Sequence, residues 1–240
     1  MGMMKMILEF QECPQYLRRQ LFPQHRYLGK AGILNAVNAP HHLLASQWCK
    51  YREGAVTSKH IGKVSLVDVG LKSYVEVDRR LEEGFRVTVK FPPEAQDMRK
   101  MYGSVVSPDE PRTVGGMYWG YTVRTANSLS EVLKSDRFEE GYDLIIGTSD
   151  KGTDAQQANL KKFNHALIVF GGVNGLEAAI ESDEALCSQA PSDVFEHYLN
   201  VCPNQASRTI RTEEAVLITM AVLSPKLVGK GVKKAKLKGK

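Results

Sequence analysis

The chain has 240 residues, 42% of them hydrophobic, which is enough to bury a sizeable core as one large domain or as a domain carrying an insertion. Its longest apolar run, residues 215–223, is about half the roughly 18 residues of a membrane-spanning helix. The first residues show neither a secretion signal nor a myristoylation signal. We therefore expect a soluble, intracellular protein with no membrane partner.

The formal net charge of +5 is concentrated at the C-terminal end. Residues 226–240 contain seven lysines and no acid, and without them 25 basic side chains stand against 27 acidic ones. This tail is the one compositionally biased segment and is predicted to be disordered. The basic charge alone therefore does not argue that the folded body binds nucleic acid.

The four cysteines, Cys13, Cys49, Cys187 and Cys202, are widely separated. They form no Cys-x-x-Cys pair, which is the spacing typical of zinc sites and redox motifs, and they do not suggest a disulfide framework. The sequence therefore predicts a reducing compartment and no metal site.

Hydrophobic periodicity divides the chain into three regions before the tail. Residues 1–46 are predicted to form short strands and helices. Apolar and polar residues alternate at 6–10, as in a short strand, and Pro14 is at a position that suits the start of a helix. Residues 47–125 have a period of two, with strands expected at 64–69, 74–77 and 85–91. This middle pattern predicts a small β-barrel or sandwich.

Residues 126–225 have the alternating pattern of an α/β domain. Helices are expected at 128–135 and 175–182, and a nearly all-apolar helix at 213–223, capped by Thr212. Apolar strands are expected at 143–146, 166–170 and 197–202. Strands this apolar, alternating with helices, indicate a parallel sheet covered on both faces.

Three polar or glycine-rich segments, 147–152, 171–177 and 202–215, follow these three strands. Ligands bind beyond the carboxyl ends of strands in an open parallel sheet, so the three loops could line one pocket. Glycines such as Gly171 and Gly172 more often serve only the turn. The polar residues of the last segment are less easily explained by structure alone. Thr212 and the acids after it suit the start of a helix, but a helix start does not account for Asn204, Gln205, Arg208 and Arg211.

The segment 170–177 (FGGVNGLE), followed by 204–215 (NQASRTIRTEEA), resembles the cofactor half of SPOUT methyltransferases, whose C-terminal segment threads through a loop as a trefoil knot. Residues 208–215 also resemble the ending of bacterial ribosomal-RNA methyltransferases that act on uridine nitrogen-3. The spaced segments 12–17, 40–42, 111–113 and 118–124 are similar to a eukaryotic and archaeal SPOUT-domain family that includes a centromere protein. The resemblance covers about residues 7–225.

This resemblance implies a knotted α/β SPOUT domain built from residues 1–46 and 126–225, with an OB-like β-barrel inserted at 47–125. It further implies an RNA methyltransferase that uses S-adenosylmethionine, acts on a base in ribosomal RNA, works as a homodimer and resides in the nucleus or cytoplasm, including the nucleolus or spindle. The cofactor would contact the following residues: Thr148, Lys151, Gly171, Gly172, Asn200, Val201, Pro203, Gln205, Thr209 and Ile210.

The family pattern is not followed at every position. Lys151 stands where many relatives have Arg, and Ala206 where many have Gly. Arg208 and Arg211 are the candidates for orienting the substrate or stabilising negative charge, with ion pairs to Glu213 or Glu214 as the structural alternative. No general base is assigned.

RNA would be held by the barrel. Lys63, Lys72, Arg79, Arg80, Arg86 and Lys90 would contact phosphate, with Tyr74 or Phe85 stacking on bases; the simpler interpretation of those charges is a solvated face.

The sequence has two alternative functional interpretations. The first is a cofactor-binding interaction protein at the spindle or centromere, in which catalysis is secondary or lost. The second is a dinucleotide-binding oxidoreductase, which fails because residues 171–175 do not form the Gly-x-Gly-x-x-Gly pattern and no early βαβ unit surrounds them.

Overall fold

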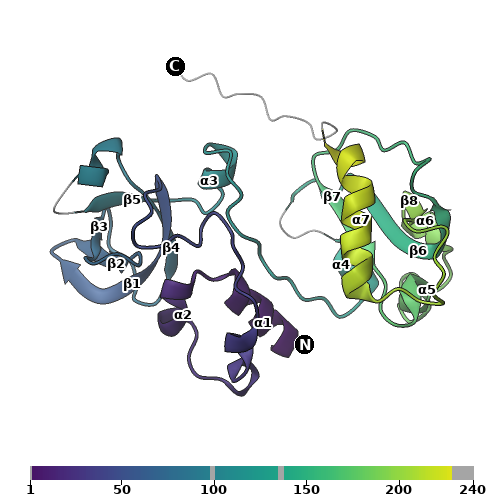
Figure 1. Cartoon of the computed structure of the whole chain (residues 1–240), viewed down its shortest axis with the longest axis horizontal. Helices are drawn as coiled ribbons and strands as arrows, with labels where there is room; N and C mark the ends of the chain where they lie inside the picture. The colour runs from purple at the N-terminus through teal and green to yellow at the C-terminus, as the bar shows by residue number, and fades with distance from the viewer. Residues whose placement is uncertain (1, 98–100, 135–137, 229–240) are drawn as a thin grey trace. The chain divides into compact units, whose positions relative to one another are not determined.

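The structure, a computed structural model, describes residues 2–97, 101–134 and 138–228. It divides into two compact units, Met1–Thr125 and Ala126–Lys240, and the division falls where the sequence pattern changes (Figure 1). Beyond Val228 the predicted lysine tail lies outside the described residues.

The first unit contains a closed barrel whose strands are ordered β1-β2-β3-β5-β4. All neighbouring pairs are antiparallel except β3 and β5, which run parallel. The core is mostly valine, such as Val67, Val75 and Val89, because β-branched side chains suit a small pleated interior. The expected barrel is thus confirmed, with these strands: β1 (Tyr51–Ile61), β2 (Val64–Asp68), β3 (Val75–Val77), β4 (Arg86–Lys90) and β5 (Tyr102–Val106).

Residues 2–46 pack against this barrel. Helices α1 (Gly2–Glu12) and α2 (Gln15–Leu21) are followed by the short 3-10 helices η1 (Arg26–Leu28) and η2 (Ala31–Ile33). The strand expected at 6–10 is wrong, since these residues lie within α1. Pro14 does directly precede α2, as expected. Two short elements, η3 (Pro93–Asp97) and α3 (Glu110–Thr113), flank β5.

A buried cluster of charges joins the N-terminal segment to the barrel. The Arg86 guanidinium donates to both Glu12 carboxylate oxygens, at 2.6 and 3.1 Å, and to Glu53 Oε2 at 2.7 Å. His41 Nε2 lies 3.0 Å from Glu12 Oε1, and Trp119 Nε1 donates to Glu53 Oε1 at 2.7 Å. Each buried charge therefore has opposite charges or donors around it, as burial requires.

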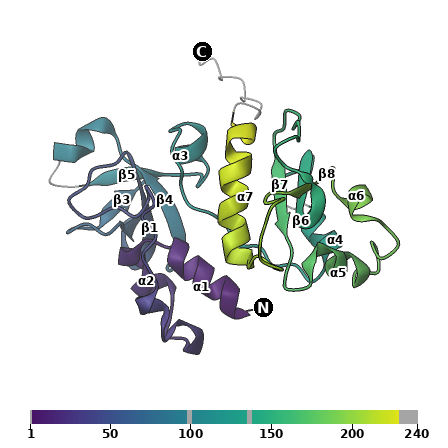
Figure 2. The same ribbon diagram turned by 45° about the vertical axis from the view of Figure 1, so that its right-hand side comes forward.

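The second unit is a three-layer α/β/α arrangement around a parallel sheet ordered β7-β6-β8 (Figure 2). Alternate strand residues face opposite layers: Ile145 packs with the helices α4 to α6, while Ile146 packs with Leu223 of α7. The predicted parallel sheet with both faces covered is thus confirmed. Its strands are β6 (Leu144–Asp154), β7 (Ala166–Phe170) and β8 (His197–Asn200), and its helices are α4 (Leu129–Leu133), α5 (Gly175–Glu181), α6 (Pro191–Val194) and α7 (Thr212–Leu227).

Two boundaries in this unit differ from expectation. Residues 147–152, predicted as a loop, continue strand β6. The N-cap of α7 is Arg211 rather than Thr212, because the Arg211 carbonyl accepts the first helical hydrogen bonds, from Glu214 and Ala215. The helix also passes through Pro225 to Leu227, so the disordered tail predicted to begin at residue 226 is wrong for Lys226 and Leu227.

The charge cluster makes the first unit sensitive to acid. Contacts with His41 and Arg86 outweigh burial and lower the pKa of Glu12 to about 2. A carboxyl with a depressed pKa stabilises the fold fully above its ordinary value of about 4.5 and loses that effect as pH falls toward 2. Replacing Glu12 by Gln should therefore cost about 3–5 kcal/mol near neutral pH, and this deficit should shrink between pH 4.5 and 2.

Urea unfolding followed by tryptophan fluorescence measures this effect, because both tryptophans, Trp48 and Trp119, lie in the first unit. Glu9→Gln is the matched control: the Glu9 side chain is 40% exposed and, among the described residues, its ion pair is with Lys5 at 3.8 Å, so the change should be within about 0.5 kcal/mol. A deficit for Glu12→Gln that stays constant with pH would contradict the assignment.

Candidate functional site

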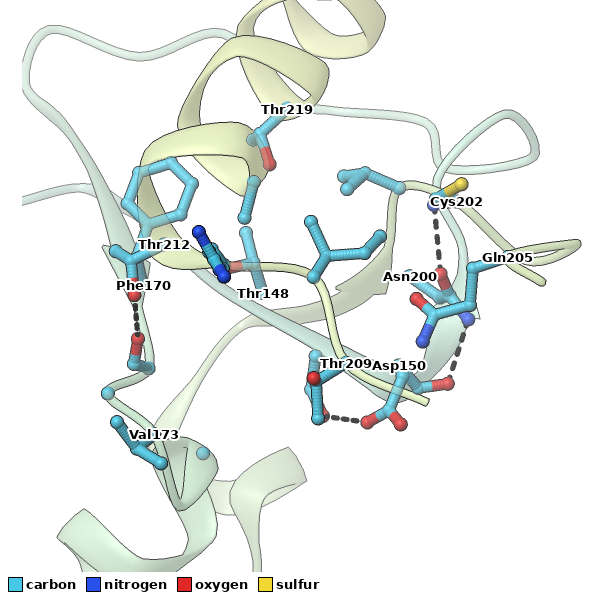
Figure 3. Close-up of a pocket in the computed structure, with 18 of the residues that line it drawn as sticks. Thr148, Asp150, Phe170, Val173, Asn200, Cys202, Gln205, Thr209, Thr212 and Thr219 are labelled. Carbon is cyan, nitrogen blue, oxygen red and sulfur yellow. Dashed lines mark hydrogen bonds between the residues drawn. The ribbon is translucent and has the colours of Figure 1, made fainter. Parts of the chain in front are cut away.

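A pocket of about 640 Å³ opens at the carboxyl ends of the three strands in the second unit (Figure 3). Its walls come from residues 148–151 within β6, from the segments that follow β7 and β8, and from the first two turns of α7. This is the edge at which open parallel sheets bind ligands. The volume is within the range of small-molecule and cofactor sites.

A bulge in β6 forms one wall. Thr148 and Thr153 both lie opposite Leu199 of β8, so the residues between them bow out of the sheet. Asn200 fixes the bulge, because its side-chain amide donates to the Asp150 carbonyl at 2.8 Å while its Oδ1 accepts the Cys202 backbone N–H at 2.9 Å. A strand bulge therefore carries the polar residues that sequence analysis assigned to a loop.

The glycine segment after β7 forms the opposite wall. Thr212 Oγ1 donates to the Gly171 carbonyl at 3.2 Å and so ties the start of α7 to this segment. Gly175 N donates to the Gly172 carbonyl at 3.0 Å and closes the turn into α5. The pocket side of Gly172 is open, since a Cβ placed there would meet no atom within 4 Å.

The charged groups of the pocket include one ion pair. Lys151 Nζ lies 3.1 Å from Glu177 Oε1, which also accepts a hydrogen bond from Ser149 Oγ at 3.3 Å. Burial raises the pKa of the Glu177 carboxyl, but hydrogen bonds from its own backbone N–H and from Lys151 outweigh that effect and lower the pKa overall. The same contact raises the pKa of Lys151.

Arg208 and Arg211 are exposed on the pocket wall. Within the residues that the structure describes, neither forms the predicted ion pair with Glu213 or Glu214; the Glu214 carboxylate instead accepts the backbone N–H of Arg211 at 3.2 Å. That structural explanation is therefore wrong: both arginines line the pocket without an ion pair to either acid.

Eleven of the twelve predicted site residues line this single pocket, and the exception is Pro203. Sequence analysis missed Glu177 and Thr219. Thr219 is fully buried, and its hydroxyl has no hydrogen-bond partner among the described residues although it borders the pocket (Figure 3). A hydroxyl within an otherwise apolar helix was the signal that could have identified it.

The predicted phosphate contacts of the barrel are only partly available. The expectation for Arg86 is wrong, because Glu12 and Glu53 hold its side chain. Lys90 pairs with Glu110 at 2.8 Å and Arg79 with Asp78 at 2.9 Å, so these two cations are partly neutralised. Tyr74 and Phe85 are exposed, as stacking on bases would require.

Among the described residues, no helix is both long and apolar enough to span a membrane, and no group of three His, Cys, Asp or Glu side chains could hold a metal ion. All four cysteines are free.

Comparison with known proteins identifies the family. Residues 1–223 match the family described as "Putative RNA methyltransferase". The chain belongs to this family.

Three of its relatives carry the name 28S rRNA (uridine-N(3))-methyltransferase. The human protein is 47% identical over 230 residues, which is 95% of this chain and 61% of that protein. The mouse protein is 48% identical over 232 residues, 95% of this chain and 60% of that protein. The Drosophila melanogaster protein is 49% identical over 224 residues, which is 92% of this chain and 46% of that protein. This chain thus spans from under half to about three-fifths of the length of these relatives.

The two neighbouring glycines of the pocket should respond differently to a methyl group. At Gly171 a Cβ would lie 2.8–2.9 Å from the backbone of Gly175 and Leu176, whereas at Gly172 it would meet open space. Gly171→Ala should therefore destabilise the second unit by about 1–3 kcal/mol, while Gly172→Ala stays within about 0.5 kcal/mol of the parent. Thermal unfolding followed by circular dichroism tests this pair, and equal melting temperatures would show that the turn is not packed as described.

Proposed function

We propose that this chain is an S-adenosylmethionine-dependent methyltransferase that acts on nitrogen-3 of a uridine in ribosomal RNA. The observation that carries the proposal is the convergence of the β6 bulge and the segments after β7 and β8 on one pocket, in a chain 47–49% identical to proteins named for that reaction. An RNA substrate of this kind favours a nuclear or nucleolar location.

The residues of the pocket suit the methyl donor. Backbone groups at Gly171 and Gly172 are accessible at close range, and the buried Thr219 hydroxyl lacks a partner that a ligand could supply. The carboxylates of Asp150 and Glu213 also line the pocket, which suits a ligand that carries an ammonium and a sulfonium group. These residues would hold the donor.

Bound S-adenosylmethionine would supply an electrophilic methyl group, so that the protein's task is mainly alignment and exclusion of water. Uridine nitrogen-3 carries a proton, which must leave as the new nitrogen–carbon bond forms. Arg208 and Arg211, which line the pocket, would stabilise the negative charge that then develops on the uracil carbonyl oxygens. The proton passes to a pocket carboxylate or to water.

Three finer assignments belong to the same proposal. A SPOUT knot built from residues 1–46 and 126–225 is favoured by the sequence resemblance and by the parallel sheet that carries the pocket. An OB-like insertion is supported by the five closed strands of the barrel. A homodimer is supported by helix α7, whose outer face carries exposed Leu217 and Met220.

A bulky side chain at Gly172 should remove donor binding without unfolding the protein. Gly172 lines the pocket and a Cβ there meets open space, so Gly172→Val should weaken binding of S-adenosylhomocysteine by at least about tenfold in calorimetry while the melting temperature stays near that of the parent. The parent should transfer tritiated methyl groups to ribosomal RNA, with the product located at uridine nitrogen-3 by base-resolved mapping.

The control for this experiment is Gly32→Val in the first unit, where a Cβ would also meet open space and which does not line the pocket. Unchanged S-adenosylhomocysteine binding by Gly172→Val would refute this location of the donor site. Donor binding without methyl transfer would favour the interaction-protein alternative instead.

The dimer makes a separate prediction. Leu217 is 74% exposed and Met220 is 43% exposed, and burying these exposed parts against a second copy would contribute about 2–3.5 kcal/mol of gross transfer free energy per subunit. The parent should sediment at twice 26.7 kDa at micromolar concentration, and Leu217→Glu should shift it to the monomer. Ile61→Glu, an equally polar change at an exposed residue of the barrel, should leave the dimer intact. A monomeric parent would contradict the proposal.

A further inference from the structure

A second hollow, of about 800 Å³, lies in the first unit, beside the ends of α1 and α2 and the start of η1. Its lining combines arginines with aromatic rings: Arg18, Arg19 and Arg26 supply positive charge, and Phe10 and Phe22 supply apolar surface. No acidic residue lines it. It takes no part in the methyl-transfer pocket, which is formed entirely by residues of the second unit.

The surrounding sequence is unusually free of acids. Between Glu12 and Glu53 there is no Asp or Glu in 40 residues, although this stretch contains six Arg and Lys side chains. The rest of the chain before the lysine tail therefore carries an excess of acid. Positive potential in the folded body is thus concentrated in the segment that forms this hollow.

Arg18 is held in place before any ligand arrives. Its Nε donates to the Cys13 carbonyl at 2.9 Å, one Nη donates to the Gln11 carbonyl at 3.1 Å, and its guanidinium lies 4.5 Å from the centre of the Phe10 ring. These contacts also satisfy carbonyl groups at the C-terminal end of α1. A guanidinium fixed in this way loses little conformational entropy when it meets an anion.

His25 adds a donor that does not depend on protonation. Its Nδ1 accepts the backbone N–H of Tyr27 at 3.2 Å, so the proton of the neutral ring must be on Nε2. Arg26 is ordered by the neighbouring Tyr27: its guanidinium lies 4.9 Å from the ring centre and donates to the hydroxyl at 3.0 Å. Arg19 is exposed and makes no ion pair with any described residue.

We propose that this hollow binds a single-stranded segment of the RNA substrate, with phosphate on Arg18, Arg19 and Arg26 and a base against Phe22. The proposal rests on the proposed function, which requires an RNA to be held. Phosphate needs cations without competing carboxylates, and arginine provides paired donors of matching geometry. The aromatic surface favours a nucleic acid over an acidic peptide, because every base offers a flat face for stacking.

The test compares two double variants that remove the same charge. Arg19→Ala/Arg26→Ala removes two cations from the hollow, whereas Lys161→Ala/Lys162→Ala removes two exposed cations from the second unit. Arg18 is left in place because it holds the end of α1. The probe is a fluorescein-labelled single-stranded RNA of roughly 12 nucleotides, followed by fluorescence anisotropy over a range of salt concentrations.

The arginine variant should bind this RNA on the order of tenfold more weakly, and its logarithmic salt slope should fall by about 1.4, the value for two lost phosphate contacts on a single strand. The lysine variant should retain the affinity of the parent. Both variants should keep the parent's melting temperature and its affinity for S-adenosylhomocysteine, so that loss of the donor site is distinguished from loss of RNA binding.

Three outcomes would overturn the proposal. An arginine variant with the parent's affinity and salt slope would show that RNA does not contact the hollow. Equal losses in the two variants would indicate nonspecific attraction. Tighter binding of polyglutamate than of RNA, lost in the arginine variant, would assign the hollow to acidic peptides while leaving the donor site of the proposed function untouched.

Discussion

The parallel pairing of β6 with both β7 and β8 is the constraint on which the candidate site depends. Parallel strands end at the same edge, so the segments that follow them meet although they are separated by tens of residues. The bulge opposite Leu199 then turns polar residues of β6 out of the sheet. Without that bulge, these side chains would alternate between the two apolar layers, where burial would be costly.

Sequence periodicity predicted the architecture correctly for strands that are buried on both faces and for strands whose side chains alternate strictly between core and solvent. Residues 166–170 form a strand with the predicted limits because every side chain in it is apolar. Residues 6–10 were misread because their alternation suits a strand, whereas the surrounding residues continue as a helix that packs along the N-terminal segment. Residues 147–152 were misread because a bulged strand and a glycine-rich loop have the same composition.

The pocket was predictable because its residues follow strands, but individual contacts were not. Thr219 was missed since its role depends on which face of α7 meets the sheet, and a helix that is apolar nearly all round does not reveal that face. Arg86 was assigned to phosphate for a related reason. Its partners Glu12 and Glu53 lie 74 and 33 residues away, and no local pattern pairs a charged strand residue with such distant acids.

Several segments that carry the family resemblance meet at this buried charge cluster, whereas the resembling segments 170–177 and 204–215 line the pocket of the second unit. Glu12, His41 and Trp119 come from three of those segments and join α1, the loop before the barrel and the loop after it. Their partners are buried groups of the same cluster, so their role is to fix the N-terminal segment on the barrel. Fixing that segment also fixes Arg18, because its anchors Gln11 and Cys13 are the neighbours of Glu12. The buried charge cluster thereby orients the arginine-lined hollow of the first unit. The polar residues of the second unit line the separate pocket at the edge of the sheet.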